Sequence, residues 1–307
     1  ARRVANAPGV LPALVAALTA GGPMATFDLQ QGAVTSGFVL EHITLSSPVL
    51  AQRVAEEPGA LPALVAALPA GGAAAAPSLQ DAATNSARVL AVVASASTAL
   101  ARRVGEEPGV LLALVTTLAA GGATATHRRQ IAAVNSVVVL GHMTLASPQL
   151  ARCMVEEPGA LPTLITAVAA GRNAAGAFNM QLLSAKTARV LADITSAYPG
   201  LTRDVATARG ALQALVTAAA AGGGGAAEAR RTMADIGCWA QVTVAARQDE
   251  CVHCGRRVDG ATDVRLRLCA GCTMARFCNT ECQRHAWGRR KEVCRALVAT
   301  RDGNGAA

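Results

Sequence analysis

Aromatic residues are scarce in this 307-residue chain, because only 2% of it is Phe, Trp or Tyr although 52% is hydrophobic. The hydrophobic content is therefore mostly Ala, Val and Leu, residues that suit closely packed helices. Few aromatic rings remain for stacking on nucleic-acid bases or for anchoring at a membrane interface. The composition favours a helical protein that uses neither of these two modes of binding.

Long apolar runs are also lacking, although the mean hydropathy is positive. The apolar segments are short and are interrupted by Pro, Gly and Arg, so none reaches the roughly 20 residues that a membrane-spanning helix needs. We therefore expect a soluble protein. The formal charge of +8 is only a mild basic excess, and it does not by itself indicate nucleic-acid binding, which requires a concentrated patch.

The first 246 residues repeat with a period of fifty. The start of each unit is recognisable as ARRVANAPGV at 1–10, AQRVAEEPGA at 51–60, ARRVGEEPGV at 101–110 and ARCMVEEPGA at 151–160. A fifth, weaker copy is shifted by one residue, so that Gly210 takes the place of Gly159 in the unit before it. Such self-similarity is typical of a solenoid of stacked units.

Each unit carries three helical patterns. The first pattern is short, with apolar residues at i and i+4, as at Leu50 and Val54. A glycine follows it at the same position in each of the first four units. The second pattern follows that glycine. Three units have a proline in its first turn, and the first three units have a Gly-Gly pair at its end, where glycine stops a helix. After a loop rich in Ala, Gly and Thr comes the third pattern, which includes Val39, Leu40 and Ile43. No unit can bury its apolar stripe alone, so the units must stack.

This order of helices around a Leu-Pro-Ala-Leu-Val segment resembles the armadillo repeat, and the resemblance covers residues 1–246. It implies an all-α, armadillo-like α-solenoid of about five repeats. HEAT repeats are the alternative, but their two helices leave the short segment unexplained. The fifty-residue period exceeds the usual armadillo period, and we assign the excess to the Ala/Gly loop.

The armadillo resemblance also implies a groove along the third helices, where an Asn ladder and a Trp ladder hold extended peptides. The aligned Asn positions are occupied here by His42, Val92, His142 and Asp193, and the aligned Trp positions by Phe38, Arg88, Val138 and Arg189. Because both ladders are missing, the resemblance supports generic protein binding rather than binding of nuclear-import signals. Residue 1 aligns with residue 51, inside a short helix, so we also expect the array to be the C-terminal part of a longer one.

Seven of the nine cysteines are concentrated between residues 251 and 294. The chain reads CVHC, fourteen residues, CAGC, five residues, CNTEC, eleven residues and a final Cys. These residues are Cys251, Cys254, Cys269, Cys272, Cys278, Cys282 and Cys294. A C-x-x-C turn supplies two of the four ligands of a tetrahedral zinc, so the cluster provides seven of the eight ligands that two zinc ions need. This spacing favours metal binding in a reducing, intracellular compartment over disulfide bonding.

The segment CAGCTMARFCNTECQRHAW, followed by RKEVC, closely resembles the MYND zinc finger. The resemblance implies that Cys251, Cys254, Cys278 and Cys282 hold one structural zinc, and that Cys269, Cys272 and Cys294 belong to a second. It further implies that Gln283 and Trp287 line a surface for proline-containing peptides. A RING finger fits worse, since it requires a histidine in the middle of the series.

One position departs from the MYND pattern. The family's eighth ligand is a histidine four residues before the last cysteine, and Arg290 stands there in this chain. A guanidinium remains protonated and cannot ligate zinc. We weigh two outcomes: His285 replaces the missing ligand, or the second site is weakened and holds its zinc with three thiolates plus water. The sequence favours the second, because His285 lies beside Cys282 of the other site.

These observations divide the chain into a repeat array at 1–246, a zinc finger at 251–294 and a tail at 295–307. They predict a non-enzymatic scaffold in the cytoplasm or nucleus that binds protein partners through both its groove and its finger. One alternative is a fragment of a SET-domain lysine methyltransferase, a class that often carries MYND fingers. Another is a nucleic-acid-associated regulator, suggested by the arginines of the finger. Cys153 and Cys238, outside the cluster, are interpreted as buried small apolar residues.

Overall fold

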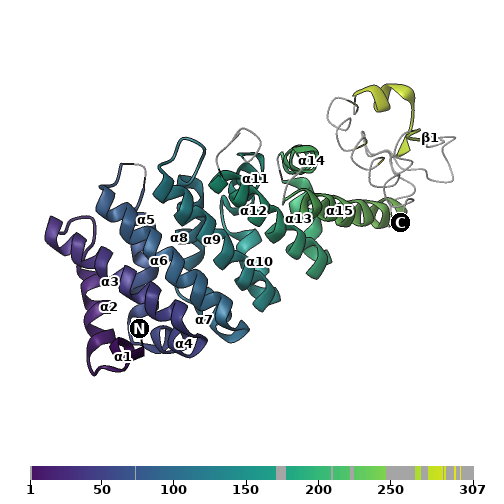
Figure 1. Cartoon of the computed structure of the whole chain (residues 1–307). Helices are drawn as coiled ribbons and strands as arrows, with labels where there is room; N and C mark the ends of the chain where they lie inside the picture. The colour runs from purple at the N-terminus through teal and green to yellow at the C-terminus, as the bar shows by residue number, and fades with distance from the viewer. Residues whose placement is uncertain are drawn as a thin grey trace.

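The computed structural model describes residues 2–72, 74–170, 178–208, 210–221 and 225–246, together with 267–270, 276–285, 287, 294 and 298 near the C-terminus. Every regular element in the described ranges up to residue 246 is a helix (Figure 1). This confirms the helical fold that the repeat predicted. Farther along the chain, the structure adds two short strands, β1 (Arg267–Leu268) and β2 (Arg276–Phe277), which the sequence pattern did not indicate.

The helices form five successive groups of three. The first four groups are α1 (Arg2–Asn6), α2 (Val10–Ala20) and α3 (Phe27–Ser46); α4 (Pro48–Glu56), α5 (Ala60–Ala70) and α6 (Pro77–Ala96); α7 (Thr98–Gly105), α8 (Val110–Ala120) and α9 (His127–Ala146); and α10 (Pro148–Glu156), α11 (Ala160–Ala170) and α12 (Phe178–Ala197). The fifth comprises the 3₁₀ turn η2 (Pro199–Leu201), α13 (Thr202–Thr207), α14 (Ala211–Ala221) and α15 (Ala226–Ala246).

A left-handed glycine joins the short helix to the second helix in every repeat. The φ angles at Gly9, Gly59, Gly109, Gly159 and Gly210 are 76°, 79°, 76°, 83° and 84°. A residue with a Cβ is strained in this conformation, whereas glycine adopts it freely. The same conformation at Gly210 confirms that the fifth copy, shifted by one residue, is a genuine repeat.

The second helices α2, α5 and α8 end directly before a Gly-Gly pair, as expected, but the first glycine of each pair is not a left-handed cap. Gly21, Gly71 and Gly121 have φ angles of −87°, −80° and −88°, so they do not form left-handed helix caps. They are needed for space instead. A Cβ placed on Gly71 would lie 2.6 Å from the Cβ of Ala83 in α6. Glycine therefore lets the end of the second helix approach the third helix closely.

The third helix, and not the loop before it, is the longest element of each repeat unit. Only six residues separate α2 from α3, α5 from α6, and α8 from α9. The third helices α3, α6, α9 and α12 each span 20 residues. The assignment of the excess length to the Ala/Gly loop is therefore wrong, because that loop has only six residues and the third helix is the longest element of the unit.

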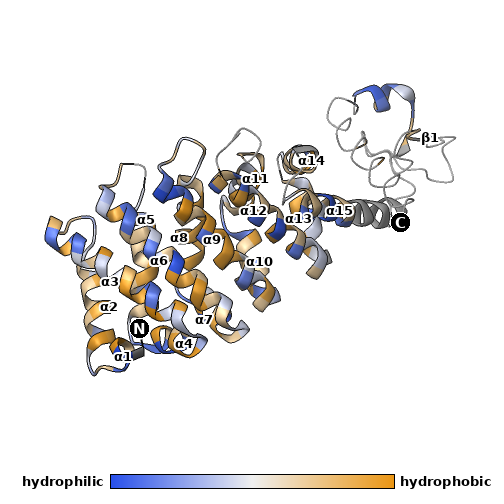
Figure 2. Cartoon of the chain, in the orientation of Figure 1, coloured by the Kyte–Doolittle hydropathy of each residue, from blue (hydrophilic) through white to orange (hydrophobic). Residues whose placement is uncertain are grey.

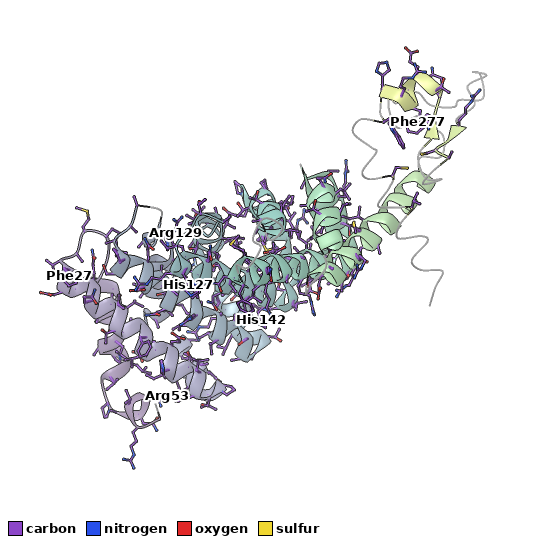
Figure 3. All side chains as sticks on the ribbon, turned by 45° about the horizontal axis from the view of Figure 1, so that its top comes forward. Phe27, Arg53, His127, Arg129, His142 and Phe277 are labelled. Atoms are coloured by element: carbon purple, nitrogen blue, oxygen red, sulfur yellow. The ribbon has the colours of Figure 1, made fainter. Side chains whose placement is uncertain are left out.

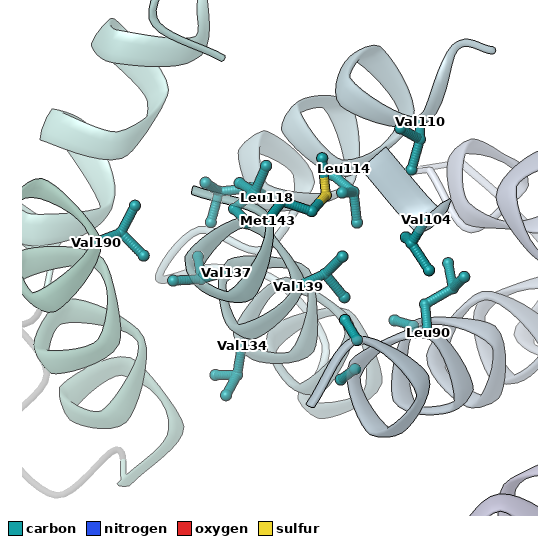
Figure 4. Packing of buried hydrophobic residues seen from close by; sticks show 14 of the residues in the cluster. Leu90, Val104, Val110, Leu114, Leu118, Val134, Val137, Val139, Met143 and Val190 are labelled. Carbon is teal, nitrogen blue, oxygen red and sulfur yellow. The ribbon is translucent and has the colours of Figure 1, made fainter. Parts of the chain in front are cut away.

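The repeats stack into two layers of helices. The third helices α3, α6, α9, α12 and α15 pack side by side in one layer, and the second helices α2, α5, α8, α11 and α14 form the other. The core lies between them. In the close-up of Figure 4, Leu114 and Leu118 from α8 meet Met143 from α9, and all three are buried. Full burial of one such side chain contributes roughly 1.5–3 kcal/mol.

Cys153 and Cys238, the two cysteines outside the cluster, were both expected to be buried. Cys153 is half-buried, with its Sγ 3.7 Å from the Nε2 of Gln149, so the expectation of a fully buried thiol is wrong. The side chain of Cys238 lies outside the described residues. Among the described helices, none is long and apolar enough to cross a bilayer.

Candidate metal centre

The two strands of the C-terminal region each end directly before a cysteine. β1 and β2 are antiparallel, with Arg267 opposite Phe277 and Leu268 opposite Arg276. Cys269 and Cys278 therefore leave this ladder at opposite ends, three residue positions or about 10 Å apart along it. Thiolates around one tetrahedral zinc lie only about 3.8 Å apart, given a Zn–S bond of about 2.3 Å. The ladder thus directs these two cysteines toward different metal positions.

The four described cysteines of the cluster form two close pairs. The Sγ atoms of Cys278 and Cys282 are 3.4 Å apart, and those of Cys269 and Cys294 are 3.7 Å apart. Both separations are close to the spacing of two thiolates on one zinc. The MYND resemblance implies the same two pairs. Cys251, Cys254 and Cys272 lie outside the described residues, so the complete sets of four and three ligands stay a prediction.

A short helix at 280–285 positions Cys282 for this pairing. The Oδ1 of Asn279 accepts a hydrogen bond of 2.8 Å from the backbone N–H of Cys282. Asparagine is a favoured helix N-cap because its side chain satisfies an N–H of the first turn that has no helical partner. The role of Asn279 was not predicted from the sequence. The signal for it was an asparagine at the expected start of a helix, three residues before the ligand Cys282.

In the described part of the finger, three side chains are buried. Phe277, which Figure 3 labels, stands at the position where the MYND resemblance implies an aromatic residue. It is buried, as are Cys269 and Cys294. Two of these three buried side chains are thus metal-ligating residue types. A domain of about 45 residues seldom folds on apolar burial alone, and metal binding would supply folding free energy here.

His285 lies on the exposed side of the same short helix. Its Nε2 is 3.9 Å from the Oε1 of Glu281, and about two thirds of its side chain is exposed. This position contrasts with the buried thiols of Cys269 and Cys294. Arg290 lies outside the described residues, so the missing eighth ligand and the weakened second site stay predictions.

The residues predicted to contact a peptide also belong to this region. Trp287 is 40% exposed, which is unusual for the largest apolar side chain, and Gln283 is half-buried. An exposed indole presents a flat apolar face with one hydrogen-bond donor, and such side chains are enriched at protein interfaces. Peptide binding by this pair is untested and stays a prediction.

The third helices bring the positions aligned with the armadillo groove onto one layer, and three of these side chains, Arg88, Arg189 and Asp193, form ion pairs. Arg88 of α6 lies 3.3 Å from Glu41 of α3, and Arg231 of α15 lies 3.2 Å from Asp193 of α12. Asp193 also pairs with Arg189 on its own helix, at 3.0 Å. Ion pairs between neighbouring repeats thus occupy positions at which the armadillo family carries its peptide-binding ladders.

Two further polar residues of the third helices have assignable roles. The Nδ2 of Asn85 donates a 3.1 Å hydrogen bond to the backbone oxygen of Val34, so it joins α6 to α3. His142 is half-buried in α9 (Figure 3). Burial lowers the pKa of His142 below 6.5, and the nearby Lys186 charge lowers it further. The neutral form of His142 is therefore favoured in the folded protein.

Comparison with known proteins assigns a family to the cysteine-rich segment. Residues 251–294 match the family of the MYND finger. Searches of curated proteins and of solved structures each return no significant match. MYND fingers are zinc-binding domains that mediate protein–protein interactions. The chain therefore carries a MYND finger at 251–294, after a helical repeat region to which the comparisons give no family.

Proposed function

We propose that this protein is a non-enzymatic interaction scaffold, in which an armadillo-like array and a MYND finger each bind protein partners. The observation that carries the proposal is the pairing of thiols within the matched finger, at 3.4 Å and 3.7 Å. Side chains at this separation suit zinc, and the nearby Trp287 is exposed. The chemistry of the finger is thus that of a folded, metal-held binding module.

In this proposal the finger holds two structural zinc ions. One is bound by Cys251, Cys254, Cys278 and Cys282, and the other by Cys269, Cys272 and Cys294. The antiparallel ladder supports the partition, because it sends Cys269 and Cys278 in opposite directions. Zinc supplies folding free energy here, since binding it replaces the large apolar core that a small domain lacks. Thiolate ligation also supports a reducing, intracellular location, in either cytoplasm or nucleus.

The partner proposed for the finger is a proline-containing peptide. A proline ring can pack on the exposed indole of Trp287, and the amide of Gln283 can exchange hydrogen bonds with a peptide backbone. Extended proline-rich segments are already ordered when free, so less conformational entropy is lost on binding. For the array, the ion pairs along the third helices favour a partner other than a nuclear-import signal.

A peptide titration tests the finger surface. We expect Trp287→Ala to weaken binding of proline-containing peptides by about tenfold or more, in line with the loss of an interface aromatic. Glu281→Ala is the matched control, because Glu281 is exposed on the adjoining helix and is not part of the proposed surface. Zinc content and circular dichroism should match in all three proteins. Equal affinity of the Trp287→Ala and unmodified chains would refute this surface.

A second experiment separates the two proposed binding regions. Capture of cellular partners is compared between the intact chain and one in which Cys278 and Cys282 are changed to Ser. Partners lost with the variant depend on the finger, and partners retained bind the array. Methyltransferase activity of a longer form, or DNA or RNA affinity that falls steeply with salt, would instead favour one of the two alternatives.

A further inference from the structure

The third helix of each of the first four repeats begins with an exposed ring. These first residues are Phe27 of α3, Pro77 of α6, His127 of α9 and Phe178 of α12. Phe27 is 69% exposed and Phe178 is 73% exposed, and the other two are exposed as well. The position is thus exposed within the array as well as in its first repeat. We name these four residues the ring row; Figure 3 labels Phe27 and His127.

Phenylalanine is scarce in this chain, yet two of its four copies belong to the ring row. In a core, such a ring would be removed from water and would stabilise the fold. Phe27 and Phe178 are instead mostly exposed, so they contribute little to the packing of the array. Aromatic side chains are enriched at protein interfaces relative to the rest of the surface. The ring row therefore has the composition of a binding surface.

Hydrogen bonds between neighbouring repeats fix the helix starts that carry the ring row. The Oγ of Ser78 donates to the Oε1 of Gln30 at 2.6 Å, and so joins α6 to α3. The Oγ1 of Thr126 donates to the Oε1 of Gln80 at 2.8 Å, and so joins the N-cap of α9 to α6. In Figure 1 the loops before α3, α6 and α9 lie along one edge of the array. The rings are thus presented from this edge on a fixed base.

The spacing of the ring row matches the period of a polyproline II helix. The helices α3, α6, α9 and α12 pack side by side, and packed helices lie about 8–10 Å apart. A polyproline II helix has three residues per turn and rises about 3.1 Å per residue, so the same face recurs about every 9.3 Å. A β-strand presents the same face about every 6.6 Å, which does not match. One turn of a polyproline II helix therefore fits one repeat of the array.

The chemistry of this edge also suits a proline-rich segment. The loops at 21–26, 71–76 and 121–126 contain only Gly, Pro, Met, Ala and Thr, so apolar rings can pack there without the cost of burying a charge. The start of α9, coloured hydrophilic in Figure 2, supplies a hydrogen-bond donor. The Nδ1 of His127 accepts a 3.0 Å bond from the Nδ2 of Asn179, so the neutral imidazole carries its proton on Nε2. That N–H can donate to a carbonyl of a polyproline II helix, which has no internal hydrogen bonds.

We propose that the ring row is the docking site for a proline-rich segment of a partner protein, bound as a polyproline II helix across the starts of α3, α6, α9 and α12. This inference rests on the proposed function of the array, the binding of protein partners, and names the surface and the chemistry of the partner. Single-stranded nucleic acid fits less well, because base-stacking sites lie along positively charged grooves. The loops of this edge are uncharged, and Arg128 at the start of α9 is paired with Asp81.

A titration of the full chain with fluorescent decaproline tests the proposal, because ten residues span about 31 Å and reach all four rings. Every protein in the series carries Trp287→Ala, which removes the proposed peptide surface of the finger. We expect Phe27→Ala to weaken binding by about threefold or more, and Phe27→Ala with Phe178→Ala by about tenfold or more. Phe38→Ala is the matched control, since Phe38 is an exposed phenylalanine of the same helix about three turns from Phe27. It should leave the affinity unchanged.

A second peptide tests the conformation of the ligand. Decaproline with its four central residues changed to Gly loses the preformed polyproline II structure, and it should bind about tenfold more weakly or worse. Circular dichroism of the proteins should be the same in all variants, because the substituted rings are exposed.

Several outcomes would overturn the proposal. One is equal decaproline affinity in the Phe27→Ala, Phe38→Ala and parent proteins, and another is equal affinity for the two peptides. Binding of oligo(dT) that Phe27→Ala weakens, without binding of decaproline, would identify nucleic acid as the occupant. A concentration-dependent dimer that Phe27→Ala dissociates would identify a second copy of the chain.

The failure of this inference can be distinguished from that of the proposed function. Capture of cellular partners is repeated with the chain in which Cys278 and Cys282 are changed to Ser, with and without Phe27→Ala and Phe178→Ala. Partners retained equally in both would overturn the ring row and leave partner binding by the array standing. Absence of any retained partner would count against the array as a binding region.

Discussion

Different interactions stabilise the fold of the helical array and the fold of the finger. In the array, apolar side chains recur at equivalent positions, and Leu90 and Leu140 of successive third helices are both fully buried. In the described part of the finger, the buried side chains are Phe277 and two cysteines. The folding free energy of the array is therefore spread over many contacts between neighbours, whereas that of the finger is concentrated in a few thiolate groups.

Removal of zinc should give the largest difference between the two regions. We expect a strong chelator to unfold the finger and to leave the helices of the array intact, because zinc-binding free energy, about 10–16 kcal/mol for small finger peptides, is folding free energy only where the ligands lie. Far-ultraviolet circular dichroism and amide exchange measure both regions at once. A loss of most of the helical signal would show that the array also depends on the metal.

A cavity in the array should have the opposite effect. Leu140→Ala is expected to lower the free energy of unfolding of the array by about 2–5 kcal/mol, the usual result of truncating a fully buried leucine. Zinc content should not change. Leu145→Ala on the same helix is the control, since Leu145 is exposed and its truncation should change stability by less than about 0.5 kcal/mol. Similar losses in the two variants, measured by urea denaturation, would contradict the packing described for α9.

The two glycines after α8 allow a comparison of two roles of glycine, namely space for close packing and freedom of the backbone. A Cβ at Gly121 would overlap Ala133, whereas nothing lies within 4 Å of a Cβ at Gly122. We expect Gly121→Ala to destabilise the array by roughly 1–3 kcal/mol through overpacking. Gly122→Ala should be neutral or slightly stabilising, because alanine has fewer unfolded conformations than glycine. Thermal melts of the two variants compare these neighbouring positions directly, and equal melting temperatures would count against the steric explanation.

Restoring a histidine ligand should make the two proposed zinc sites more similar in affinity. Arg290→His should raise the zinc affinity of the second site by about tenfold or more, roughly 1.4 kcal/mol, since a neutral imidazole replaces a cation that cannot ligate. His285→Ala should change the affinity little. Competitive chelation of the three proteins provides the measurement. Two equally tight zincs in the unmodified chain, one of them lost in His285→Ala, would show that His285 is the eighth ligand.

The smallest expected effect is a pH dependence in the array. The pKa of His142 is lowered from 6.5 in the folded protein, so the unfolded chain binds more protons between pH 6.5 and that lower value. Stability should therefore fall as the pH falls below about 6.5, and His142→Gln should remove this part of the decline. Lys186→Met should reduce it, because the Lys186 charge is the second cause of the shift. Urea midpoints that run parallel in all three proteins would exclude His142 as a source of the dependence.

Periodicity made the array the more predictable of the two regions. The fifty-residue repeat predicted three helices per unit, and the position of Gly210 predicted the shifted fifth copy. The close packing at Gly71 could not be predicted in the same way, because a local sequence pattern does not show that Ala83 of the next helix lies against this glycine. The sequence likewise predicted a buried Cys153, whereas the structure shows this side chain half-buried in α10.

In the finger, the spacing of cysteines indicated a metal centre, and the match at 251–294 supports it. The spacing alone did not reveal the antiparallel ladder or the cap by Asn279, since two-residue strands leave no detectable alternation. The pairing of Cys269 with Cys294 joins residues 25 positions apart. Resemblance implied that pairing, but only the folded chain brings the two thiols within 3.7 Å of each other.

The sequence by itself determined the helical repeats, their boundaries near each glycine, and the cysteine-rich segment, because local periodicity and ligand spacing are properties of neighbouring residues. The tertiary structure decided which of those features meet. It placed Glu41 against Arg88 and the Nδ2 of Asn85 against the backbone oxygen of Val34, both across repeats. Contacts of this kind depend on which helices of neighbouring units pack on one another, so the pattern within one unit does not reveal them.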